Sequence, residues 1–90
     1  MSGYSAPNIT MQPASVMVSA GQMAMFGVVA TGPGPLSYQW MKNSVNIPGA
    51  VGPSYTTPTV SNADNNEQFA VTISNPYGST TSNHAVLTVN

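Results

Sequence analysis

Apolar and polar residues alternate at every second position along most of this chain, as in β-strands with one buried face. No stretch shows the spacing of an amphipathic helix. Clusters of Gly, Pro, Asn and Ser separate the alternating runs. The runs lie at residues 8–12, 15–19, 22–30, 37–42, 45–47, 54–60, 68–74 and 81–89. This pattern predicts an all-β domain over residues 1–90, a sandwich of two antiparallel sheets with about seven strands. Residues 1–7 are expected to form a loosely structured lead.

The parity of the alternation separates a buried face from an exposed face on each predicted strand. In the run 22–30, Phe26 and its neighbours of the same parity are predicted to point inward. Applied to the other runs, the same reasoning predicts a core. Its members are Ala24, Phe26, Val28, Tyr38, Trp40, Phe69, Val71, Ile73, Leu87 and Val89.

The other parity of the run 22–30 gives a candidate contact surface. Met23, Met25 and Val29 must point outward if their neighbours point inward. Exposed contiguous apolar area usually marks a partner surface, and methionine is flexible and polarizable enough for such contacts. The alternative is that the strand at 8–12 partly covers these side chains.

Tyr77 is a second candidate for partner contact. It lies in the turn "NPYG", and binding residues are often found on such loops. The alternative is a tyrosine that lies flat over neighbouring strands. Together with the methionines, Tyr77 completes the predicted contact set.

Charged residues make up 3% of the chain, which carries one Lys, no Arg and a net charge of -1. Without a basic patch, we expect no nucleic-acid partner. The longest apolar run is far shorter than the roughly 18 residues of a membrane helix, so we expect no membrane insertion. A net charge near zero gives little repulsion between free domains, which favours a place inside a larger assembly.

The residues that could perform chemistry are few. His84 is the only imidazole, Asp64 and Glu67 are the only carboxylates, and Lys42 is the only side-chain amine. A nucleophilic triad needs a base, an acid and a nucleophile together. His84 is predicted to lie on the final strand, toward the other end of the hairpin from both acids. We therefore predict no catalytic residue, no cofactor and no enzymatic activity.

The segment "DNNE", from Asp64 to Glu67, has the oxygen-rich character of a calcium site. The preferred interpretation is a polar turn in which Asp and Asn bond to their own backbone. No metal site is therefore predicted.

Several segments appear in an order known from one family of β-sandwiches. A strand after a glycine carries an aromatic and then Val28, the next long strand carries the lone tryptophan, and a later strand reads "FAVTISNPYG". The residues concerned are Gly21, Ala24, Phe26, Val28, Trp40, Phe69, Val71, Asn75 and Gly78. In these positions the chain resembles immunoglobulin-like domains of the I-set type. The resemblance implies an immunoglobulin-like β-sandwich in which Val28 and Val71 stand where that family has its disulfide cysteines. It also implies that the turn "NPYG" lies beside the loop "TGPGP" and the N-terminus.

The chain has no cysteine, so no disulfide forms. Phe69 stands where the family has a tyrosine whose hydroxyl bonds to the backbone. A native disulfide contributes about 2–5 kcal/mol to a small domain. Two buried valines contribute about 1.5–3 kcal/mol each. The domain is therefore expected to fold without oxidation.

Cysteine-free domains of this kind resemble those of phage structural proteins and of bacterial surface proteins. The length, the starting Met and the lack of a signal peptide favour the first. We expect a non-catalytic module on the virion surface, as a capsid decoration protein, bound to a capsid or neighbouring surface subunit. The alternative is a spacer or adhesive domain, with a surface glycan as ligand, of a secreted or cell-surface bacterial protein.

Overall fold

The computed structural model describes residues 5–90, which form ten strands and one short 3-10 helix. The strands are β1 (Asn8–Met11), β2 (Val16–Val18), β3 (Met25–Gly27), β4 (Val29–Thr31), β5 (Ser37–Lys42), β6 (Val45–Asn46), β7 (Ser54–Thr56), β8 (Glu67–Asn75), β9 (Gly78–Thr81) and β10 (Ala85–Val89), and the helix is η1 (Asn62–Asp64). In this part of the chain, no helix has the length and apolar character needed to cross a membrane.

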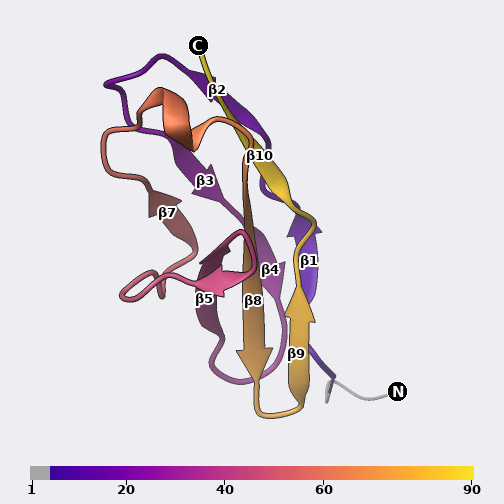
Figure 1. The fold of residues 1–90 in the computed structure, drawn as a ribbon. Helices are drawn as coiled ribbons and strands as arrows, with labels where there is room; N and C mark the ends of the chain where they lie inside the picture. Colours follow the sequence, from indigo (N-terminus) through magenta and orange to yellow (C-terminus); the bar gives the residue numbers. More distant parts are fainter. Residues whose placement is uncertain (1–4) are drawn as a thin grey trace.

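The strands form two layers (Figure 1). One layer contains β1 paired with β4 and β3 paired with β7. Because only Val28 separates β3 from β4, these four strands form one continuous face. The other layer has the order β2-β10-β8-β5-β6, with β9 paired to β8. The predicted all-β sandwich is confirmed.

One pair of strands within residues 5–90 differs from the expected antiparallel pairing. Strand β2 runs parallel to β10, with Val16 opposite Leu87 and Val18 opposite Val89. The reason is that the chain changes layers near Pro13, so β1 lies in one sheet and β2 in the other. Pro13 lacks a backbone N–H and cannot continue the first ladder.

Two runs that the sequence predicts as single strands are interrupted. The run 22–30 is divided at Val28, whose N–H donates to the carbonyl of Pro53 at 3.0 Å. The run 81–89 is divided at Ser82, which is buried and exchanges two hydrogen bonds with Val71. These divisions raise the number of strands above the predicted seven.

The core lies between the two layers. Phe26 and Phe69 stack with ring centroids 4.6 Å apart, and the indole Nε1 of Trp40 donates to the carbonyl oxygen of Gly52 at 2.8 Å. Tyr38 is half-buried and packs against this cluster. The other predicted core residues are buried in it: Ala24, Val28, Val71, Ile73, Leu87 and Val89.

Part of the lead predicted at residues 1–7 lies outside the described residues. Residues 5–7 are hydrogen-bonded to the β8–β9 hairpin. The Asn75 side-chain amide donates to the Ser5 carbonyl at 2.8 Å, and the Thr80 hydroxyl donates to the Pro7 carbonyl at 2.6 Å. These bonds hold the start of the described chain against the end of the domain that carries the β8–β9 turn.

Candidate functional site

The outer face of the β1–β4 and β3–β7 layer carries exposed apolar side chains. Met23, Met25 and Val29 are 60%, 64% and 49% exposed. Met11 is 64% exposed and lies opposite Val29 in the ladder. We call Met11, Met23, Met25 and Val29 the methionine face. Strand β1 lies beside β4 in the same sheet, so it leaves this face open.

Met11 was not among the predicted contact residues. The alternation of the run 8–12 gives Met11 the parity of Ile9, which packs against the core. A register shift between Ile9 and Met11 reverses that parity. A bulge of this kind leaves no clear mark in a short strand without glycine, so the sequence pattern alone does not indicate it.

The methionine face is bordered by uncharged positions. Opposite Met25 in the ladder is Thr56, and opposite Gly27 is Ser54. The chain's Lys, Asp and Glu side chains lie elsewhere, around a pocket at the edge of the sandwich. The face therefore presents thioether and aliphatic groups next to uncharged residues.

Tyr77 lies apart from the methionine face, in the turn between β8 and β9 (Figure 1). Its side chain is 47% exposed, and its backbone N–H donates to the Asn75 side chain at 2.9 Å. The Asn75 amide also donates to the carbonyls of Ser5 and Pro33. The turn, the Gly/Pro-rich loop and the start of the described chain therefore meet at one end of the domain, as the resemblance to immunoglobulin-like domains implies.

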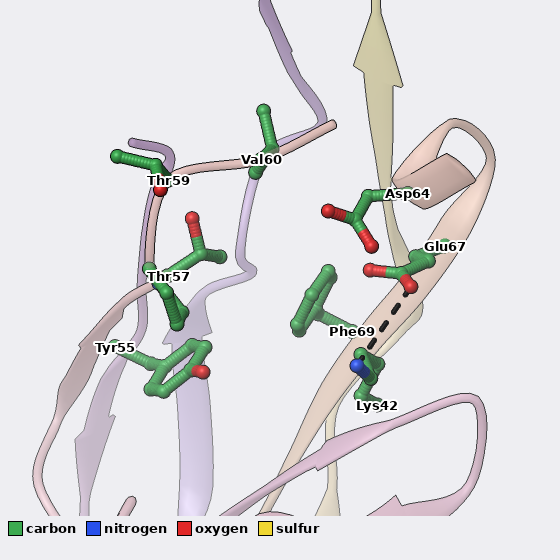
Figure 2. Close-up of a pocket in the computed structure, with 9 residues that line it drawn as sticks. Lys42, Tyr55, Thr57, Thr59, Val60, Asp64, Glu67 and Phe69 are labelled. Carbon is green, nitrogen blue, oxygen red and sulfur yellow. Dashed lines mark ion pairs between the residues drawn. The ribbon is translucent and has the colours of Figure 1, made fainter. Parts of the chain in front are cut away.

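A pocket of about 150 Å³ opens between the two layers, at the edge formed by β7 and η1 (Figure 2). Figure 2 shows Tyr55 and Thr57 on one side of it, and Lys42 and Glu67 on the other. The residues that line it are Lys42, Tyr55, Thr57, Pro58, Thr59, Val60, Asp64, Glu67 and Phe69.

The pocket contains every Lys, Asp and Glu of the chain, one amine and two carboxylates. Lys42 Nζ lies 3.7 Å from Glu67 Oε2, and the side chains are 48% and 16% exposed. Burial raises the pKa of Glu67, the neighbouring Asp64 raises it further, and Lys42 partly offsets both effects. The pocket carries a net charge of -1 when all three groups are ionised.

This convergence was not predicted, because it depends on strand pairing that the sequence does not reveal. Lys42 lies opposite Phe69 in the β5–β8 ladder, so it is diagonal to Glu67. In the sequence, Lys42 ends one strand and Glu67 precedes another. The pairing of those two strands, which sequence alone leaves open, brings the charges together.

His84 does not join the pocket, and Asp64 also belongs to a polar turn. His84 is exposed in the connection between β9 and β10, not on the final strand as predicted. The Asp64 carboxylate accepts a hydrogen bond from the Ser61 N–H at 2.9 Å, as in the polar-turn interpretation. Among the described residues, no three His, Asp or Glu side chains are grouped as metal ligands.

Comparison with solved structures identifies the fold. The structure is similar to the tandem immunoglobulin repeats of Dlar, with a TM-score of 0.83 and 17% identity over 97% of this chain and 49% of that chain. A titin domain in a trigonal crystal form matches with a TM-score of 0.82 and 18% identity over 96% of this chain and 97% of that chain. An I-band fragment of titin matches with a TM-score of 0.79 and 27% identity over 92% of this chain and 32% of that chain.

No family model matches the sequence. Among curated proteins, the chain is similar to the decoration protein of Escherichia phage T5, with 38% identity over 72 residues. The match covers 76% of this chain and 43% of that protein. The chain thus spans less than half the length of this relative. From its fold and its lack of cysteine, the chain is a cysteine-free immunoglobulin-like domain.

Proposed function

We propose that this chain is a non-catalytic immunoglobulin-like module displayed on a phage virion, as part of a capsid decoration protein. The observation that carries the proposal is the 38% identity to the phage T5 decoration protein. The relative is named a decoration protein of a phage, which supports a place on the virion surface. A capsid or neighbouring surface subunit is the proposed partner.

The methionine face is the proposed attachment surface. Met23, Met25 and Val29 are each about half exposed or more, and Met11 extends the surface across to β1. Burial of apolar area contributes roughly 25 cal/mol per Å². An uncharged face of this kind favours a partner surface that is also apolar and neutral, since an unpaired partner charge would be costly to bury.

Tyr77 is proposed as a separate contact at the β8–β9 end of the domain. Its place on a turn, away from the methionine face, suits contact with a second neighbour or with a surface glycan. The spacer or adhesive domain of a bacterial surface protein remains the second candidate. It is favoured by the arrangement of the described chain, whose two ends lie at opposite ends of the domain (Figure 1).

The test uses particles assembled from the genome that encodes this chain, with its coding sequence deleted. Purified protein added to such particles is expected to co-sediment with them to a saturating stoichiometry. Bovine serum albumin under the same conditions serves as a control for protein that is carried into the particle pellet without binding. The proposal would be overturned if the purified protein did not co-sediment with the particles and also restored no surface density in electron micrographs.

A further inference from the structure

Strand β7 is an open edge of its sheet. Within residues 5–90 it pairs only with β3. At one end of this pairing the Val28 N–H donates to Pro53, and at the other the Thr57 N–H donates to Ala24. In an antiparallel ladder these bonds alternate, so Tyr55 also directs its N–H and C=O toward β3.

The residues on either side of Tyr55 therefore direct their backbone groups the other way. The N–H and C=O of Ser54 and of Thr56 point away from β3, toward the open edge. Both residues are exposed. Such a row of unpaired groups is a template for an added strand. Pro53 and Pro58 lie at its two ends and limit the addition to a short segment.

The charged pocket lies directly beside this edge. Tyr55 and Thr57 line the pocket, and their side chains point into the sandwich (Figure 2). The exposed side chains of Ser54 and Thr56 lie on the opposite face of the strand. A strand added to β7 places the side chains opposite Tyr55 and Thr57 on the same inner side. One of those side chains would enter the pocket.

The composition of the pocket selects the kind of side chain. Asp64 and Glu67 outnumber the single cation, Lys42, and Glu67 is already largely buried. The apolar walls formed by Phe69 and Tyr55 suit an aliphatic stem with a charged head. A volume of about 150 Å³ admits a single side chain rather than a larger ligand.

We infer that the β7 edge and its pocket form a binding site for an extended segment of a partner protein, which pairs with β7 and inserts a Lys or Arg side chain into the pocket beside Asp64 and Glu67. A second copy of this chain is a poor donor, because its only Lys or Arg is Lys42, which already lines the pocket. Main-chain bonds supply affinity in this mode, and the pocket supplies specificity. The inference does not depend on the proposed function, since it concerns a different surface.

The test titrates the ¹⁵N-labelled chain with an acetylated Thr-Val-Thr-Lys-Thr-Val-Thr amide, in which lysine and both valines share one face. We expect amide shifts at Ser54, Thr56 and Glu67. A matched peptide with norleucine in place of lysine keeps the stem and loses the charge. It should bind about tenfold more weakly, the size of one charge-assisted contact. No shift at millimolar peptide, or equal binding of both peptides, would overturn the site.

Two variants separate the edge from the pocket. Thr56→Pro removes the outward N–H and should abolish binding of both peptides. The double variant Asp64→Asn, Glu67→Gln keeps the edge and should remove the preference for lysine. The ¹⁵N spectrum of each variant reports its fold directly. Met23→Lys alters the methionine face and should leave peptide binding unchanged. Shifts at that face instead of the β7 edge would contradict the assignment.

Discussion

At the scale of single residues, the core depends on aliphatic contacts where related domains have a disulfide. Trp40 and Val71 lie opposite each other on β5 and β8, and both are fully buried. Val28 belongs to the same buried cluster. Stability here comes from apolar area removed from water, without the entropic constraint that a cross-link places on the unfolded chain.

Val71→Ala should lower the free energy of unfolding by about 1–3 kcal/mol, because it removes two buried methyl groups and leaves a cavity. Urea denaturation followed by Trp40 fluorescence measures this loss. Val45→Ala is the matched control: Val45 is 68% exposed, and its truncation should change stability by less than about 0.5 kcal/mol. Equal effects at the two positions would show that Val71 does not support the core.

The raised pKa of Glu67 predicts how stability depends on pH. The folded state holds this proton to higher pH than the unfolded chain, whose glutamate has the ordinary pKa of 4.5. As pH rises from 4.5 through the raised pKa, the unfolded state releases its proton first and stability falls. Above that range the loss of stability from Glu67 is complete, and below pH 4.5 there is no such loss.

Denaturant unfolding at a series of pH values tests this sign. Glu67→Gln has no proton to release at this position, so its stability should fall less than that of the original chain as pH rises through that range. Asp64→Asn removes one cause of the raised pKa and should give an intermediate slope. Identical pH dependence in the chain and in Glu67→Gln would contradict the assignment.

At the scale of elements, the alternation of apolar residues predicted most strand positions and the buried parity of the long strands. It did so because strands with one buried face must alternate. The same rule failed for Met11, where a bulge changes the parity, and at Ser82, where a buried hydroxyl bonds to Val71 and divides the strand. Those departures depend on contacts between distant segments, which a local pattern does not contain.

The candidate surfaces also divide into those that the local sequence pattern predicts and those that depend on contacts between distant segments. The exposed positions of Met23, Met25 and Val29 follow from the parity of the single run at residues 22–30. The pocket needs the pairing of β5 with β8 and the position of β7 in the opposite sheet, so its three charges appear unrelated in the sequence. The open edge of β7 also depends on which strands are neighbours.

Met23→Lys should leave the fold intact and weaken attachment to particles by about tenfold or more, because an exposed position tolerates lysine but an apolar interface does not. Co-sedimentation with particles that lack the protein measures the effect. Met17→Lys is a matched control, since Met17 is 66% exposed on β2, in the other layer. Equal attachment of the two variants would count against the methionine face.

The end of the domain near Tyr77 depends on close contact between two loops. Gly34 has a φ of +74°, and a Cβ there would lie 3.2 Å from Pro76 Cδ. Gly34→Ala should therefore cost the backbone strain of about 1–2 kcal/mol together with a steric clash. Gly21→Ala, with a φ of +91° and open space around it, should cost the strain alone. Thermal unfolding of both variants separates the cost of the steric clash from that of the backbone strain. An equal loss of stability in the two variants would mean that the loops are not in close contact.

At the scale of the whole molecule, the described chain is elongated, with extents of 48 × 22 × 17 Å. Ser5 is held at the β8–β9 end, and Asn90 bonds to Val18 at the other (Figure 1). The methionine face runs along one long side, and Tyr77 lies at one end. This arrangement suits the proposed attachment, in which one flank contacts a surface and the opposite sheet faces solvent.

A cryo-electron microscopy reconstruction of particles made from the genome that encodes this chain tests the account most directly. The account predicts density for the β-sandwich on the outer surface of the capsid, with Met23 and Met25 against a capsid or neighbouring subunit. Particles without such density, or with this domain bound through the opposite sheet and the methionines facing solvent, would contradict it.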